Sequence, residues 1–125
     1  MSDPVADLIT RIKNAQLAKL CNVDIPHSNF KLDILSVMKK NFIIEDSKIL
    51  EDKPFKVIKV NFGSKKISHI KRLSKPGRRY YVKANQIPSP LRGLGLVVMS
   101  TPKGVISGFE AKKLNIGGEL ICEVW

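Results

Sequence analysis

The chain has 125 residues and a mass of 14.0 kDa, and 43% of its residues are hydrophobic while 26% are charged. This ordinary globular composition excludes a disordered or low-complexity protein. Its 22 Lys and Arg residues outnumber its 11 Asp and Glu residues and give a net charge of +11 at pH 7. In so short a chain this surplus indicates a polyanionic partner, either a nucleic acid or an anionic membrane.

The first half of the sequence predicts secondary structure in the order α-β-α-β-β. Asp3 as N-cap, Pro4 at the first helical position and Asp7 in the first turn predict a helix start. Its apolar residues follow helical spacing and form one stripe of Val5, Leu8, Ile9, Ile12 and Ala15. A short strand is expected over 23–25, and it ends at Pro26.

A second helix is then expected, capped by Ser28 or Asn29 and closed by residues 39–41. Its buried side is predicted to contain Phe30, Ile34, Leu35 and Met38. We expect the next strand to start at Ile43-Ile44, and the alternation of Ile58, Val60 and Phe62 with other residues predicts a further strand.

The second half predicts mostly strands, with a short helix. Strands are expected over 67–73, 79–82, 96–99 and 119–125, and Lys75-Pro76-Gly77-Arg78 is expected to form a type II turn. Ser107 and Glu110 match a capping box and predict a helix through Lys113. Because side chains alternate along a strand, one of Tyr80 and Tyr81 is expected in the core and the other at the surface.

The charge changes character close to Gly63-Ser64-Lys65-Lys66, which predicts two domains, residues 1–64 and a basic domain of residues 65–125. Residues 1–55 carry eight bases and eight acids, whereas residues 56–125 carry fourteen bases and three acids. No carboxylate occurs from residue 53 to residue 109. Solubility alone does not require this absence, so we favour binding of a polyanion over a merely solvated surface.

Nucleic acid is favoured over a membrane. The bases lie in strand-like and turn-like sequence rather than on an amphipathic helix. No apolar run is long enough to span a bilayer, and the acidic start of the sequence predicts neither a secretory signal nor a transit peptide. Cys21 and Cys122 lie far apart and are expected to be free, core-type thiols in a reducing cytosol.

The sequence predicts no enzyme, no metal site and no cofactor. His27 and His69 stand alone without neighbouring ligands at metal spacing, and no phosphate-binding loop is present. A metal-dependent nuclease needs several carboxylates at one place, and the basic region supplies none.

Three stretches are candidate nucleic-acid contacts. In Ser100-Thr101-Pro102-Lys103-Gly104, the two hydroxyls can bind bases or sugars, Lys103 can bind a phosphate, and Gly104 permits close approach. An ordinary strand-to-helix turn explains this stretch equally well. Gly117-Gly118-Glu119 is either a tight turn with a salt bridge from Glu119 to a lysine, or a site that offers backbone N–H groups and a carboxylate to a base.

The third stretch, Arg78-Arg79-Tyr80-Tyr81, pairs bases with aromatic rings, so an exposed tyrosine there can stack on an unpaired base. Side chains that can bind phosphates and so set position rather than sequence choice are Lys71, Arg72, Lys75, Arg78, Arg79, Lys83 and Arg92.

Several of these motifs together resemble the bacterial-type small-subunit ribosomal protein eight family. The matching stretches span the chain in order: DPVADLITRIKN at 3–14, SKPGRRYY at 74–81, GLG at 93–95, STPKG at 100–104, GGE at 117–119 and CEVW at 122–125. The resemblance implies a two-domain α+β fold, with no catalysis, that binds the central domain of small-subunit ribosomal RNA.

The resemblance also implies specific sites and surroundings. The loop of Ser100, Thr101 and Lys103 and the nearby Gly117, Gly118 and Glu119 would lie against an irregular RNA helix, with Tyr81 as the stacking residue. Further backbone contacts would come from Asp3, Pro4, Thr10, Arg11 and Asn14. The expected partners are ribosomal RNA and neighbouring ribosomal proteins, with the chain a monomer in a cytoplasmic, or else an organellar, small subunit.

Two departures from the family pattern stand out. Pro102 replaces a serine, which removes one hydroxyl and one backbone N–H. Ser107-Gly108-Phe109 replaces the more usual Thr-Asp-Arg at the start of the last helix.

Two other classes of function remain as alternatives. A DNA-binding regulator would need a basic recognition helix, although the two early helices lie in the charge-neutral half. An RNA-processing enzyme would need a cluster of carboxylates that the basic region lacks.

Overall fold

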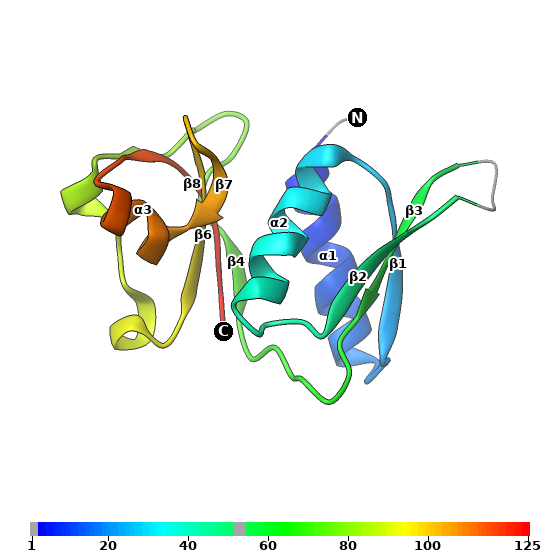
Figure 1. Ribbon diagram of the computed structural model, residues 1–125. Helices are drawn as coiled ribbons and strands as arrows, with labels where there is room; N and C mark the ends of the chain where they lie inside the picture. The colour runs from blue at the N-terminus through cyan, green and yellow to red at the C-terminus, as the bar shows by residue number, and fades with distance from the viewer. Residues whose placement is uncertain (1–2, 52–54) are drawn as a thin grey trace. The chain divides into compact units, whose positions relative to one another are not determined.

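A computed structural model describes residues 3–51 and 55–125 of the chain (Figure 1). The charges of Asp52 and Lys53, which enter the sequence count, lie outside the described residues. The fold divides into two compact units, residues 1–67 and residues 68–125. Each unit is a mixture of helices and antiparallel strands, so the predicted α+β class is confirmed.

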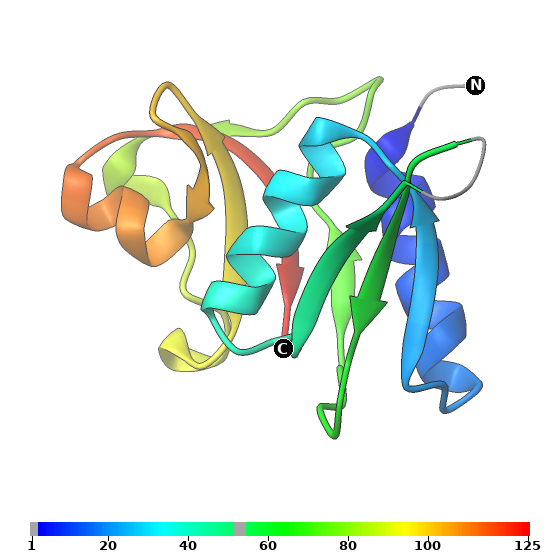
Figure 2. The same cartoon turned by 45° about the vertical axis from the view of Figure 1, so that its right-hand side comes forward.

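The first unit contains two helices and a three-stranded antiparallel sheet in the predicted order α-β-α-β-β. Its elements are α1 (Pro4–Leu17), β1 (Asn22–Pro26), α2 (Asn29–Lys40), β2 (Asp46–Leu50) and β3 (Val57–Asn61). The strand order is β1-β3-β2, and both helices lie on one face of the sheet (Figure 2). Because α1 and α2 are separated by a strand of this sheet, they do not form a helix-turn-helix.

Helix α1 forms where its cap and apolar stripe predict it. The Asp3 carboxylate accepts a hydrogen bond from the backbone N–H of Ala6 at 3.3 Å, and Pro4 occupies the first turn. The buried residues of the helix are the predicted Val5, Leu8, Ile9, Ile12 and Ala15. Local sequence alone therefore fixes the start of this helix and its buried face.

Helix α2 begins after Ser28, whose hydroxyl accepts from the N–H of Lys31 at 3.2 Å. Phe30 is only half-buried, whereas the unpredicted Lys31 is buried. The strand expected to start at Ile43-Ile44 starts later, because β2 begins at Asp46. The reason is that Phe42 has a φ of 63° and the N–H of Ile43 binds the carbonyl of Met38, so these residues terminate the helix.

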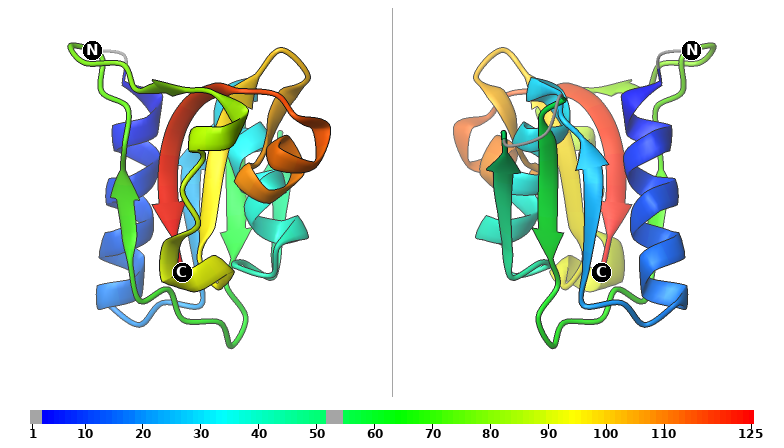
Figure 3. Two further views of the ribbon diagram at one scale, coloured as in Figure 1. Left: turned by 90° about the vertical axis from the view of Figure 1, so that its left-hand side faces the viewer. Right: turned by 90° about the vertical axis from the view of Figure 1, so that its right-hand side faces the viewer.

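The second unit is built on an antiparallel sheet in which β8 is central (Figure 3). Its strands are β4 (Ile70–Arg72), β5 (Tyr81–Val82), β6 (Leu96–Thr101), β7 (Gly104–Ser107) and β8 (Gly118–Val124). The strand order is β4-β8-β6-β7, and β5 also pairs with β8. Two short 3-10 helices, Ala84–Gln86 and Pro90–Gly93, precede β6.

Helix α3 (Gly108–Leu114) packs on this sheet and closes a core of Ile87, Val97, Met99, Ala111 and Leu120. As predicted, the Ser107 hydroxyl caps the helix by accepting from the N–H of Glu110 at 3.1 Å. Gly108 fits this core because a Cβ there would lie 3.0 Å from the Ile87 side chain. A side chain at this position would therefore require the Ile87 side chain to shift slightly.

Several predictions for the second unit were wrong in detail. The strands expected over 67–73 and 79–82 shorten to β4 and β5. The turn at residues 75–78 is not type II, because Gly77 lacks the positive φ that type II requires at that position. Pro at the preceding position suits type I equally well, so the sequence did not distinguish the two. Residues 100–104 lead into strand β7 rather than directly into a helix.

In the described part of the chain, no helix is both long enough and apolar enough to cross a membrane.

Candidate nucleic-acid interface

The strand register brings three candidate residues, far apart in sequence, into one row across the sheet. Ser100 of β6 pairs with Glu119 of β8, and Glu119 also pairs with Tyr81 of β5. Directly paired residues of antiparallel strands project to the same face of a sheet. The next residues, Met99 and Leu120, pair with each other and lie in the core beneath α3. The row therefore presents a hydroxyl, a carboxylate and a phenol ring on the face opposite to the α3 core.

The two glycines before Glu119 allow the strands to approach closely enough to form this row. A Cβ at Gly118 would lie 2.3 Å from the carbonyl oxygen of Ser100, and one at Gly117 would lie 2.3 Å from that of Val82. Neither glycine has a positive φ. They are thus required for close packing of β8 against β5 and β6 and do not form a tight turn, since Gly118 is already the first residue of β8.

The hydroxyls of Ser100 and Thr101 have different surroundings. The Thr101 hydroxyl donates to the carbonyl of Gly104 at 2.8 Å and accepts from the N–H of Lys103 at 3.2 Å, so it stabilises the turn between β6 and β7. The half-buried Ser100 hydroxyl makes no hydrogen bond to any described residue. Ser100 is therefore the hydroxyl of this pair that is free to bind a partner.

The turn of residues 101–104 accommodates the unusual proline. Pro102 is exposed at the first central position, where its fixed φ is favourable. Gly104 has a φ of 109°, which favours glycine over other residues, and a Cβ there would meet nothing within 4 Å. Lys103 is exposed at the tip of the turn, where its ammonium group can reach a phosphate.

Glu119 is bound by neighbours within the unit. Its Oε2 atom accepts from the hydroxyl of the buried Ser74 at 2.5 Å and from Nη1 of Arg79 at 3.1 Å. The Glu119 side chain is only 17% exposed, and that of Arg79 is 54% exposed. The salt bridge expected with a lysine is thus made with an arginine, and Ser74, which the sequence analysis did not single out, is the second partner.

The predicted phosphate contacts of this unit are accessible. Lys71, Lys75, Arg78 and Arg79 are exposed, and Arg72 is half-buried with its Nε donating to the carbonyl of Ser74 at 2.6 Å. Both tyrosines are exposed, Tyr80 by 50% and Tyr81 by 67%. The expectation that one tyrosine enters the core was wrong, because β5 begins only at Tyr81 and the neighbouring Val82 is the residue that packs on the core.

The N-terminal candidates lie in α1 of the first unit. Asp3 and Pro4 form its start, and Thr10, Arg11 and Asn14 are exposed on it. Asp3 and Pro4 thus have a structural role as helix cap and first residue.

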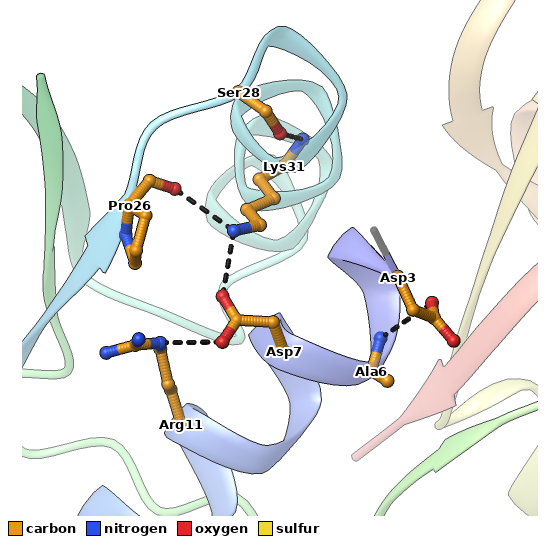
Figure 4. Close-up of polar contacts among 7 residues, drawn as sticks. All are labelled: Asp3, Ala6, Asp7, Arg11, Pro26, Ser28 and Lys31. Atoms are coloured by element: carbon orange, nitrogen blue, oxygen red, sulfur yellow. Dashed lines mark hydrogen bonds and ion pairs between the residues drawn. The ribbon is translucent and has the colours of Figure 1, made fainter. Parts of the chain in front are cut away.

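Arg11 belongs to an ion-pair network centred on Asp7 (Figure 4). The Asp7 carboxylate accepts from Nε of Arg11 at 2.9 Å and from Nζ of Lys31 at 2.8 Å, and Lys31 also donates to the carbonyl of Pro26 at 3.2 Å. Partial burial acts to raise the pKa of Asp7, but the hydrogen bonds from Lys31 and Arg11 outweigh it and lower this pKa. The network joins α1 to α2 and to the end of β1.

His69 packs against neighbouring side chains, and the two cysteines differ in their exposure. His69 stacks on Trp125 with ring centroids 4.0 Å apart, and its Nε2 lies 3.0 Å from the Glu123 carboxylate. Both cysteines are free, but Cys21 is exposed, so its expected place in the core was wrong: it precedes β1 rather than facing the helices. Burial, with a smaller contribution from Glu123, raises the pKa of Cys122 to about 12.

Residues 3–51 and 55–125 contain no group of three or more His, Cys, Asp or Glu side chains that could hold a metal ion. Phe109, the unusual residue of α3, is 70% exposed. The Lys113 ammonium group lies over the Phe109 ring, with its Nζ atom 5.0 Å from the ring centroid.

Comparison with known proteins agrees with the resemblance seen in the motifs. The family model described as Ribosomal protein S8 matches residues 3–125. A protein of Kosmotoga olearia named small ribosomal subunit protein uS8 is 47% identical, over 99% of this chain and 98% of its own length. Proteins of the same name from Thermus aquaticus and Lactobacillus helveticus are 42% and 45% identical, over all of this chain and 99% and 98% of their own lengths.

These matches confirm that the protein is not an enzyme, because the family consists of structural ribosomal proteins. They cover both units, including the row of Ser100, Glu119 and Tyr81. The chain belongs to the ribosomal protein S8 family.

Proposed function

We propose that the protein is a structural constituent of the small ribosomal subunit and that it binds the central domain of the small-subunit ribosomal RNA. Its relatives carry the name of a small-subunit protein, and its charge of +11 suits a partner rich in phosphates. The chain acts as a monomer within a cytoplasmic ribosome, and its further partners are neighbouring ribosomal proteins.

The observation that carries this proposal is the row of Ser100, Glu119 and Tyr81, with exposed cations beside it. The free Ser100 hydroxyl binds a base edge or a 2′-hydroxyl in the wide minor groove of RNA. The exposed Tyr81 ring stacks on an unpaired base. These two contacts choose the RNA by its shape and by its accessible bases.

The cations supply affinity that depends little on sequence. Lys103 at the turn after β6, and Lys71, Arg72, Lys75, Arg78 and Arg79 around the hairpin of residues 74–80, bind phosphates. Gly104, Gly117 and Gly118 let the RNA backbone or the neighbouring strand approach closely. From the first unit, the α1 residues Asp3, Pro4, Thr10, Arg11 and Asn14 form a further contact with the RNA backbone.

Replacing Ser100 tests the proposed readout. We expect Ser100→Ala to weaken binding to a central-domain RNA fragment by about 1–2 kcal/mol, or about 5- to 30-fold, because one hydrogen bond to the RNA is lost. Binding to an unrelated structured RNA should stay within about twofold. Fluorescence anisotropy at fixed salt measures both affinities.

Ser36→Ala is the matched control, since Ser36 is an exposed serine of α2 in the first unit. Adding Thr101→Ala to Ser100→Ala should raise the total loss to about 2–4 kcal/mol, because the Thr101 hydroxyl holds the turn that carries Lys103. If Ser100→Ala weakened both RNAs equally, or had no more effect than Ser36→Ala, the assignment of Ser100 would be wrong.

A further inference from the structure

An acidic side chain beside a phosphate-binding surface needs a physical reason, because its charge repels the RNA backbone. Glu119 is the only Asp or Glu between residues 111 and 122, and it lies in the middle of the proposed interface. Two donors, Ser74 and Arg79, already bind its Oε2 atom, and the side chain is only 17% exposed. These contacts suit a carboxylate that holds the Ser74 and Arg79 side chains in position.

We propose that Ser74 and Glu119 are positioning residues that fix Arg79 for contact with an RNA phosphate, and that Glu119 acts on the RNA through Arg79 rather than by binding a base. This inference rests on the proposed RNA-binding function and specifies how one part of that surface works. It replaces the alternative that the Glu119 carboxylate accepts a hydrogen bond from a base amino group.

The hairpin that carries Arg79 is anchored to β8 by its backbone. On one side, the N–H of Leu73 donates to the carbonyl of Ile121 at 3.0 Å; on the other, the carbonyl of Tyr80 accepts from the N–H of Leu120 at 2.9 Å. The turn is closed by two hydrogen bonds between Lys75 and Arg78, at 3.0 and 2.9 Å. The backbone on both sides of Ser74 and Arg79 is therefore fixed.

Ser74 connects the two sides of this hairpin to Glu119. Its buried hydroxyl donates to Glu119 and accepts from the N–H of Tyr80 at 3.0 Å, so both of its hydrogen-bonding functions are used. Its carbonyl accepts from Nε of Arg72 at 2.6 Å. A single buried serine thus connects two arginines of the proposed surface to one carboxylate.

Arg79 keeps most of its donors available. A guanidinium group has five N–H donors, and the Glu119 carboxylate occupies Nη1 only. The remaining donors of Arg79 make no hydrogen bond to any described residue, and the side chain is 54% exposed. An arginine held at one end loses less conformational freedom when it binds a phosphate, which favours binding.

A double-mutant cycle between Glu119 and Arg79 tests the inference on the full chain with the central-domain RNA fragment. We expect Arg79→Ala and Glu119→Ala each to weaken binding about three- to tenfold, the loss of about one charge-assisted contact. In the Arg79→Ala background, Glu119→Ala should add less than about 1.5-fold. In each single variant, the slope of log affinity against log salt concentration should also fall by about one released ion.

The conservative variant Glu119→Gln should bind within about threefold of the unchanged protein, because its amide oxygen can accept the same two hydrogen bonds. Glu51→Ala is the matched control, since it removes a carboxylate from an exposed ion pair with Lys56 outside the proposed surface. If the loss of affinity in the double variant equalled the product of the two single losses, the inference would be overturned. An Arg79→Ala variant that binds the RNA normally would also overturn it.

A measurement on the free protein separates this inference from the proposed function. The heteronuclear NOE of the Arg79 Nε–H group should show an ordered side chain in the unchanged protein and a mobile one in Glu119→Ala and Ser74→Ala. Equal mobility in all three would overturn the inference without reference to RNA. An ordered Arg79 in a protein that ignores the RNA fragment would instead contradict only the proposed function.

Discussion

Replacing Gly118 by alanine tests whether the close approach of β8 to β6 holds the row of Ser100, Glu119 and Tyr81 together. The new Cβ would lie 2.3 Å from the Ser100 carbonyl oxygen and 3.1 Å from its carbonyl carbon, whereas ordinary contacts begin at 3.4 Å. Since the obstructing atoms belong to the backbone, a side-chain rotation cannot relieve the overlap.

The magnitude follows from the distance that the strands must move. To reach an ordinary contact, β8 must separate from β6 by about 1 Å at this point, which stretches a hydrogen bond of about 2.9 Å beyond the 3.2 Å limit of good geometry. One or two such bonds contribute about 1 kcal/mol each, and overpacking adds about 1–3 kcal/mol. We therefore expect Gly118→Ala to lower the free energy of unfolding by about 2–5 kcal/mol.

Urea unfolding followed by circular dichroism measures this loss, with Gly77→Ala as the control. A Cβ at Gly77 meets nothing within 4 Å and its φ is not positive, so we expect a change within about 0.5 kcal/mol. Binding of Gly118→Ala to the RNA fragment should also fall, because Ser100 and Glu119 separate. Equal stability of the two variants would refute the close-approach argument.

Three further predictions concern charge and thiol chemistry. Asp7→Asn should lower the free energy of unfolding at pH 7 by about 2 kcal/mol, because it leaves the Lys31 ammonium group, which is only 8% exposed, without its charged partner. Breaking a fully buried ion pair costs about 3–5 kcal/mol. The loss here is smaller because Asp7 is 36% exposed. Because folding lowers the pKa of Asp7, the stabilisation by its carboxylate is present above about pH 4 and is lost as the pH falls further. Urea unfolding between pH 7 and pH 3 should show the free energies of unfolding of the variant and the unchanged protein converging. A difference that stays constant over this range would contradict the prediction. Ellman's reagent at pH 8 should react rapidly with Cys21 alone, because Cys122 is buried with a pKa of about 12; two rapid thiols per chain would be the contrary result. Lys75→Ala should weaken cognate and unrelated RNA equally and lower the salt slope by about one ion, as seen in affinities between 50 and 200 mM salt; a loss confined to the cognate RNA would make Lys75 a readout residue.

The parts of the fold that depend on neighbours in sequence were predictable. The cap at Asp3 and the apolar stripe of α1 need only the residues from 3 to 15, and the Ser107 cap of α3 needs three more residues along the chain. The alternation around Ile58 likewise identified β3. In each case the hydrogen bond or the buried face is formed within one element, so composition and spacing determine it.

Features that depend on distant residues were not predictable. The predicted strand start at Ile43 was wrong because this residue still takes part in the end of helix α2. The predicted start at Arg79 was wrong because pairing with β8 begins only at Tyr81. A register shift between Val98 and Met99 helps to set which residues face Glu119. No local pattern shows such a shift.

The candidate site was predicted as residues but not as an arrangement. The motifs identified Ser100, Glu119 and Tyr81, and pairing with β8 showed that they are neighbours. Ser74 was missed because a serine before a turn is common in loops, and its burial becomes evident only when Glu119, 45 residues away, is placed beside it. Nothing in the structure beyond the contact with Lys113 explains why Phe109 is present.

The most direct test of the account is chemical footprinting of the small-subunit ribosomal RNA with and without this chain, at fixed salt. We predict protection confined to the central domain, retained by Ser36→Ala and reduced by Ser100→Ala. Protection spread evenly over the RNA, or the same pattern for both variants, would contradict the claim that a few uncharged groups on a cationic surface select the RNA.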